Sequence, residues 1–166
     1  MAEESIDVTR DFQAKPPHGD FTIKKIYCKD ISFETPNSPA MFQVEWKPNA
    51  DVQLRTSVSE TATAEYEVVL TVTVTVLIDD APAFLAEVKQ AGIFGITGLT
   101  SDERGAILGS YCPSILFPFS REVIADLITR GGFPQFVLAP INFEALYAKH
   151  LAGETETQLE SDKGQS

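Results

Sequence analysis

The sequence holds only two histidines and two cysteines among 166 residues, the side chains on which most catalytic and metal-binding motifs depend. Cys28 and Cys112 stand far apart and in no paired motif, which favours free thiols in a reducing compartment. His18 falls in a polar terminal stretch, and His150 suits the dipole near the end of a helix. No hydrolase, zinc-protease or phosphate-loop motif is present. We therefore expect no catalytic residue, no metal site and no cofactor, and so not an enzyme.

Long apolar runs are also missing, and the first residues, MAEESIDVTR, lack the basic and apolar regions of a secretory signal. Basic residues are few: 13 stand against 24 acidic ones, which gives a net charge of −11. A folded chain of this charge repels phosphate backbones, so nucleic acid is excluded as the expected partner. These features predict a cytoplasmic protein without direct membrane insertion, suited to a basic partner attracted by long-range charge.

The first half of the chain shows the two-residue alternation of β-strands. It predicts strands over 21–34, over 42–54 with an interruption at KPNA, over 65–78, and over 83–94. The stretch DDAP, at 79–82, has the composition of a hairpin turn. Four strands joined in this way predict an antiparallel sheet with one covered face and one solvated face.

The second half changes to helical spacing. Thr100 and Glu103 form a capping-box pattern that predicts a helix to about residue 111, stopped by Pro113. A second helix is expected to open at Pro118 and to end at the glycines 131–132. Asn142 can cap a last helix. Strands followed by helices indicate the α+β class, with a four-stranded antiparallel sheet and C-terminal helices.

The ends of the chain differ in composition from its middle. Residues 1–20 and 152–166 are polar and poor in large apolar side chains, and the second of these stretches is acidic. We therefore expect one domain over 21–151, flanked by two flexible tails.

Two features of the expected surface indicate a possible binding function. Asp30 and Glu34 share one face of the first strand, and Leu85 and Glu87 share the solvated face of the last. If these faces lie on the same side of the sheet, they form an acidic patch with an apolar centre, which suits a basic, partly apolar peptide. The alternative is an ordinary solvated face.

The second feature is apolar material in segments broken by proline and glycine. This material indicates a groove or an oligomer interface, or else a core built partly from loops. Its residues are Phe42, Trp46, Val52, Leu54, Ile115, Leu116, Phe117, Phe119, Phe133 and Phe136.

Several long stretches resemble the SecB family of bacterial protein-export chaperones, over nearly all of 21–151. They are IYCKDISFETPNSP (26–39), FQVEWKP (42–48), YEVVLTVTVTV (66–76), AFLAEVKQAGIF (83–94), GSYCPSILFPFSRE (109–122) and RGGFPQFVLAPINFEALY (130–147).

The resemblance implies an α+β fold and a homotetramer, assembled as a dimer of dimers. It implies binding of unfolded precursor polypeptides without a nucleotide, and their delivery to the SecA translocase ATPase for export. The zinc-binding C-terminal tail of SecA, which is basic, would dock on the acidic sheet surface. The oligomer interface would use 101–111 and 83–91.

The family pattern also assigns residues. The positions that match the SecA-binding site are Asp30, Glu34, Leu85 and Glu87. The positions that match the client groove are Phe42, Trp46, Val52, Leu54, Phe143, Leu146, Tyr147 and Leu151. The alternative function, from a different class, is a small α+β enzyme or ligand-binding domain that uses the aromatic groove for one small molecule.

Overall fold

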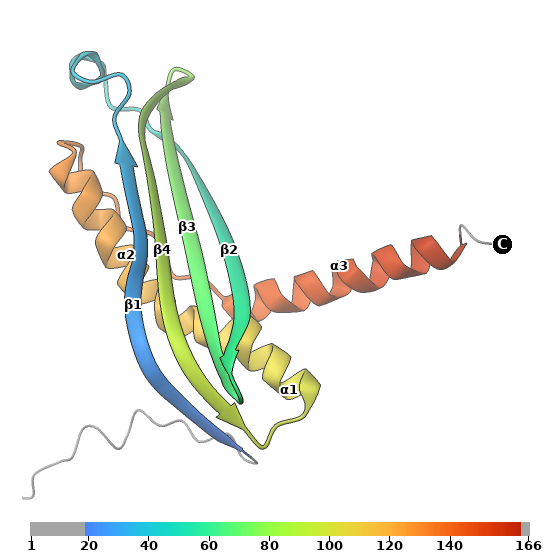
Figure 1. The fold of residues 1–166 in the computed structure, drawn as a ribbon. Helices are drawn as coiled ribbons and strands as arrows, with labels where there is room; N and C mark the ends of the chain where they lie inside the picture. The colour runs from blue at the N-terminus through green and yellow to red at the C-terminus, as the bar shows by residue number, and fades with distance from the viewer. Residues whose placement is uncertain (1–18, 164–166) are drawn as a thin grey trace, which may run out of the picture.

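The computed structural model describes residues 19–163, and the side chains of this range up to residue 153. Four long strands form one antiparallel sheet in the order β1-β4-β3-β2. They are β1 (Asp20–Glu34), β2 (Asn49–Ala62), β3 (Glu65–Ile78) and β4 (Ala81–Thr97). The sheet is strongly curved, and the helices α1 and α2 lie on one side of it (Figure 1).

Strand β3 shows why this sequence makes a two-faced sheet. Val68, Val72, Val74 and Val76 are fully buried beneath the helices, whereas the threonines between them are half-buried on the other side. β-branched side chains suit extended backbone, and the alternation gives each face its own chemistry. We call the side away from the helices the open face. The predicted bounds of this strand, 65–78, agree with β3.

The helical half begins as predicted and then departs from prediction. Thr100 caps α1 (Ser101–Ala106), and Glu103 completes a capping box with it. The chain then continues without a break through a π-helical turn (Ile107–Tyr111) into α2 (Cys112–Arg130). In that turn the Cys112 N–H donates to the carbonyl of Ile107, five residues earlier.

The expectation that Pro113 stops the first helix and Pro118 opens another is therefore wrong. Pro113 directly follows the π-helical turn, and Pro118 lies inside the helix. An interior proline costs a helix roughly 3 kcal/mol. Here the neighbouring Leu116 and Phe117 are buried in the core, and their burial offsets that cost.

The last helix, α3 (Phe143–Lys163), begins where the sequence predicts. The side-chain oxygen of Asn142 accepts a hydrogen bond from the Ala145 N–H at 3.0 Å. The helix then projects away from the body of the protein (Figure 1). It continues past residue 151, where we expected the domain to end; of the N-terminal tail predicted over 1–20, residues 1–18 lie outside the described residues.

Alternation misled the prediction of a strand at 42–47. The segment instead holds a short 3-10 helix, η1 (Ala40–Gln43), followed by irregular chain before β2. Phe42 and Trp46 both contact Phe133, with ring centroids 5.1 and 5.8 Å apart. Their spacing serves this aromatic contact and not a sheet ladder.

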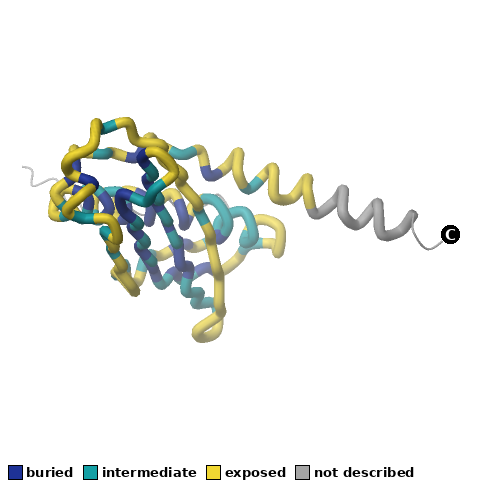
Figure 2. The backbone as a smooth tube through the Cα atoms, turned by 90° about the horizontal axis from the view of Figure 1, so that it is seen from above, coloured by how far each residue is buried: buried dark blue, intermediate teal, exposed yellow. Residues whose placement is uncertain are grey.

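Most of the core lies between the sheet and α2. Figure 2 shows the buried residues gathered along the middle of the sheet and the inner side of the helices. Strand β2 contributes almost nothing to it, because every residue of β2 except Leu54 is exposed. Strand β2 is thus an edge strand that is exposed to solvent, although it carries apolar side chains on the face towards the helices.

Candidate functional site

The four residues of the predicted docking patch lie together on the open face. Glu34 pairs with Leu85 across β1 and β4, and in the same register Asp30 pairs with Lys89. Directly opposed residues of an antiparallel pair point to the same side of the sheet. Since Leu85, Glu87 and Lys89 alternate with buried residues, this side is the open face. We keep the name docking patch for Asp30, Glu34, Leu85 and Glu87.

The docking patch is acidic but not uniformly so. Glu87 accepts a hydrogen bond from the Thr73 hydroxyl at 3.0 Å, which fixes its carboxylate over the middle of the sheet. Leu85 is half-buried between neighbours, so part of its side chain is available to a partner. Lys89 adds a positive charge directly beside Asp30, which the sequence prediction had not included.

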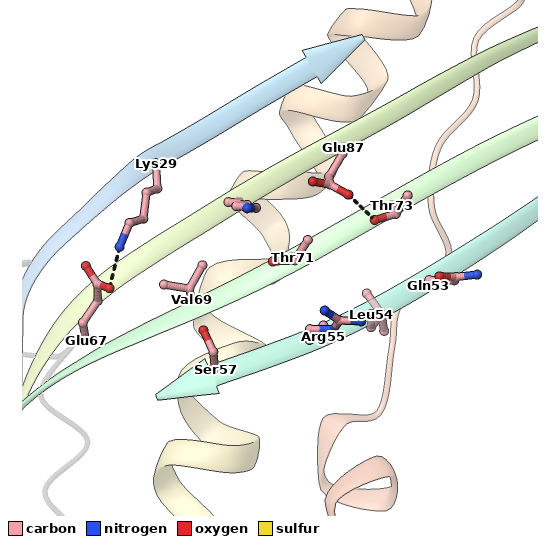
Figure 3. A pocket seen from close by; sticks show the side chains of 11 residues that line it. Lys29, Gln53, Leu54, Arg55, Ser57, Glu67, Val69, Thr71, Thr73 and Glu87 are labelled. Carbon is pink, nitrogen blue, oxygen red and sulfur yellow. Dashed lines mark hydrogen bonds and ion pairs between the residues drawn. The ribbon is translucent and has the colours of Figure 1, made fainter. Parts of the chain in front are cut away.

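Next to the docking patch, a shallow trough of about 610 Å³ crosses β2, β3 and β4 (Figure 3). Its lining is mostly polar and consists of Lys29, Gln53, Leu54, Arg55, Ser57, Glu67, Val69, Thr71, Thr73, Glu87 and Lys89. The trough extends the candidate surface from the sheet's β1 side towards the edge strand β2.

At the β1 end of the trough, cross-strand bonds tie β1 to β3 over β4. Lys29 pairs with Glu67 at 2.7 Å, and Lys24 pairs with Glu65 at 2.6 Å. The Tyr27 hydroxyl also donates to Glu67. Lys29 first, and Tyr27 second, lower the pKa of Glu67, whereas the bond to this carboxylate raises the pKa of Tyr27 to about 12. These bonds hold the carboxylates charged on the open face.

On the helix side, an apolar groove of about 780 Å³ runs between β2 and the helices. It brings together five of the eight residues predicted for client binding, which are Val52, Leu54, Phe143, Leu146 and Tyr147. The other lining residues are Arg55, Thr56, Val58, Gly105, Leu108, Gly109 and His150. Val58 could have been found from the sequence, because it continues the alternation of Val52 and Leu54.

Tyr147 lies against two glycines of the opposite helix segment. A Cβ added at Gly109 would stand 2.6 Å from the Tyr147 ring, and one at Gly105 would stand 3.0 Å from its hydroxyl. Distances this short cannot be accommodated without movement of the ring. The two glycines, four residues apart, therefore form the notch that seats Tyr147 and sets the floor of the groove.

Phe42, Trp46 and Leu151 do not line the groove. Phe42 and Trp46 belong to an aromatic cluster around Phe133 at the far end of the sheet. Phe42 is half-exposed there, at 51%. Leu151 lies exposed on the projecting part of α3. The predicted single groove is thus two separate apolar surfaces, the groove and the aromatic cluster.

The described residues contain no group of three or more histidine, cysteine or acidic side chains that could hold a metal ion. Cys28 is exposed and Cys112 is buried, and burial raises the pKa of the Cys112 thiol. His18 lies outside the described residues. Among residues 19–163, no helix is both long and apolar enough to cross a membrane. What the described surface offers is binding: an apolar groove and cluster, and a charged sheet face.

The comparisons with known proteins agree with this description. Residues 13–154 match the family described as preprotein translocase subunit SecB. The protein-export protein SecB of Nitrosococcus oceani is 52% identical over 151 residues, which cover 90% of this chain and 91% of that protein. The corresponding protein of Methylococcus capsulatus is 50% identical over 135 residues, covering 81% and 87%.

Among solved structures, the chain is similar to a SecB-like chaperone of Mycobacterium tuberculosis, solved in complex with a peptide from an antitoxin. The TM-score is 0.61 at 18% identity, over 73% of this chain and 90% of that one. This likeness shows the α+β fold that the sequence predicts. Family match, close relatives and fold together establish that the chain belongs to the SecB family and functions as a protein-export chaperone.

Proposed function

We propose that this chaperone binds unfolded precursor polypeptides in the apolar groove and on the aromatic cluster, without using a nucleotide. The observation that carries the proposal is the groove itself: apolar side chains of β2 and α3 face each other there while partly exposed. Apolar burial of this kind holds many unrelated chains with little sequence preference. The solved M. tuberculosis chaperone binds a peptide, which supports the same activity here.

The free edge of β2 supports this proposal further. Strand β2 pairs only with β3, so its outer N–H and C=O groups face solvent beside the groove. An extended client could add main-chain hydrogen bonds there while its side chains enter the groove. A client long enough to reach the aromatic cluster as well would gain affinity from both sites.

The partner that receives the client is proposed to be the SecA motor, whose basic, zinc-binding C-terminal tail would dock on the docking patch. The common face of Asp30, Glu34, Leu85 and Glu87 supports this assignment. The docking patch and the groove lie on opposite sides of the sheet, so the two partners would not compete for the same side chains.

A cytoplasmic homotetramer, arranged as a dimer of dimers, completes the proposal. The expected interface segments are 101–111 and 83–91. Strand β4 is paired on both sides, so its part of an interface can come only from side chains. Strand β1, in contrast, has a free edge, and Ile31 on it is 47% exposed. The free edge of β1 and the exposed side chain of Ile31 are both available for contact with another copy of the chain.

Light scattering tests the proposed function directly. The purified protein is measured alone and with a denatured, slow-folding precursor diluted into it, with no nucleotide present. We expect a mass near four chains and stoichiometric suppression of aggregation. A monomer that leaves the precursor to aggregate would contradict both the assembly and the holding activity, and binding of one small compound only would favour a ligand-binding domain.

A further inference from the structure

Two positively charged residues stand in one row across the middle of the open face. Arg55 on β2 pairs in register with Thr71 on β3, and Thr71 pairs with Lys89 on β4. The three residues thus form one row across the sheet, with the hydroxyl of Thr71 between the two cations. Neighbouring strands lie about 4.8 Å apart, so the Cα atoms of Arg55 and Lys89 are separated by roughly 10 Å. Side chains of this length can both reach a group placed above Thr71.

The acids of the trough are already engaged, but these two cations are not. Glu67 accepts from Lys29 and Tyr27, and Glu87 accepts from Thr73. Among the side chains described, those of residues 19–153, neither Arg55 nor Lys89 forms an ion pair or side-chain hydrogen bond. Figure 3 shows this contrast, with dashed contacts at Glu67 and Glu87 and none at Arg55.

We infer that the row Arg55–Thr71–Lys89 is a carboxylate seat, which binds an acidic side chain of the same peptide that docks on the docking patch. Arginine and lysine both hold carboxylates by charge-assisted hydrogen bonds, and a threonine hydroxyl adds a third donor. A peptide is favoured over a free anion because the trough continues directly from the docking patch, through the shared Glu87. The inference rests on the proposed docking of a basic tail and specifies that partner further.

The sheet geometry sets the spacing of the partner's residues. Lys89 lies four residues after Leu85 on β4, so an extended peptide over Leu85 reaches the seat about four residues away, at ~3.3 Å per residue. The partner segment should therefore carry basic residues around an apolar one, and an acidic residue four positions along. A uniformly basic segment would instead place a lysine or arginine against Arg55 and Lys89.

Short fluorescent peptides test the inference on the full-length protein. Each carries a leucine flanked by lysines, with an aspartate four residues after it or four residues before it, because the chain could run either way. Matched peptides carry asparagine at the same place. We expect one of the aspartate peptides to bind about fivefold tighter than its asparagine partner, a preference that weakens as salt is raised.

Variants of the protein then test whether the row Arg55–Thr71–Lys89 causes the preference for the aspartate peptide. Arg55→Gln with Lys89→Gln should abolish it, whereas Lys25→Gln, which removes an unpaired cation elsewhere on the open face, should leave it intact. Arg55→Glu should reverse the preference in favour of a peptide with lysine at that place. Leu85→Gln should weaken the binding of the aspartate and the asparagine peptide equally. That result would show that both peptides bind on the open face.

Equal binding of the aspartate and asparagine peptides to the unmodified protein would overturn the carboxylate seat. So would a preference that survives in the Arg55→Gln, Lys89→Gln variant, or a failure of all the peptides to bind. The protein would still suppress precursor aggregation under each of these results. Failure of the seat and failure of the proposed chaperone function are therefore distinguishable.

Discussion

The Tyr27 hydroxyl on β1 donates a hydrogen bond to Glu67 on β3, although β4 runs between these two strands. The contact is possible because Tyr27 stands opposite Ala91, whose small side chain leaves room above β4. Lys29 joins the same carboxylate at 2.7 Å. Strands β1 and β3 are thereby connected by side chains over β4 on the open face, in addition to the backbone ladders.

Tyr27→Phe should remove this connection without changing the fold. The expected loss is about 1 kcal/mol or less in the free energy of unfolding, since the bond is partly solvated. Urea unfolding at pH 7 measures it. Tyr111→Phe is the matched control, because Tyr111 contacts Phe21 through its ring, at 5.2 Å. A loss as large in the control would show that the hydroxyl bond is not the cause.

The same bond predicts how stability depends on pH. Because the folded pKa of Tyr27 is raised from 10.0 to about 12, its contribution is full below pH 10 and is lost as the pH rises towards 12. The pKa of Glu67 is lowered, so its contribution is present above the usual carboxyl pKa and is lost on acidification. Unfolding curves from pH 3 to 11 should show both losses in the unmodified protein. In Tyr27→Phe the loss above pH 10 should be smaller, and an unchanged alkaline slope would contradict the assignment.

Glu87→Lys and Leu85→Gln should each weaken binding of the SecA tail, the first by about tenfold, or 1.4 kcal/mol. Both side chains are partly solvated, so the fold should be retained. Titration calorimetry with the isolated tail measures the effect. Glu60→Lys controls for net charge, because Glu60 is exposed on β2 and pairs with Tyr66 on the helix side. Unchanged affinity in Glu87→Lys would rule out the docking patch as the SecA site.

Val52→Asp combined with Leu54→Asp should impair client holding, because it places two charges in the apolar groove. The matched control is Gln53→Asp combined with Ser57→Asp, which adds the same charge to the same strand but on the open face. Suppression of precursor aggregation should fall strongly in the first variant and remain in the second. Equal suppression by both would mean that clients bind elsewhere, for which the aromatic cluster is the next surface to test.

Gly109→Ala should displace Tyr147 from its notch and destabilise the protein by about 1–3 kcal/mol, as overpacked sites do. Removing the ring should relieve this, so Gly109→Ala with Tyr147→Ala should recover part of the loss, as measured in a double-mutant cycle by urea unfolding. Gly153→Ala is the control, because a Cβ there meets nothing within 4 Å. Additive effects of the two changes would show that Gly109 and Tyr147 are not coupled.

How far the sequence predicts this structure depends on which constraint dominates locally. Strand β3 was predicted to its ends because every second residue is a buried apolar side chain, and turn residues follow it. The helix through Pro113 and Pro118 could not be predicted, because local backbone rules were overridden by a π-helical turn and by burial of Leu116. Propensity is a weak guide where the core supplies more free energy than a proline costs.

The binding surfaces can likewise be divided into features that the sequence predicts and features that it does not. The common face of Asp30 and Leu85 depends on strand order and register, which alternation within one strand does not contain; the family resemblance supplied it. The separation of Phe42 from the groove follows from its contact with Phe133, a residue far along the chain. The seat at Arg55 and Lys89 required the pairing of both strands with β3. Alternation indicates which residues share a face of one strand, whereas a surface that joins several strands depends on strand order and register.

Strand β2 places Leu54 and Arg55, which are neighbours in sequence, at the groove on one side of the sheet and at the carboxylate seat on the other. Single substitutions along this strand should therefore alter the proposed client binding or the proposed motor recognition separately. An insertion or deletion of one residue would instead exchange the two faces and disable both activities together. Over evolutionary time β2 should accept many replacements but hardly any change in length.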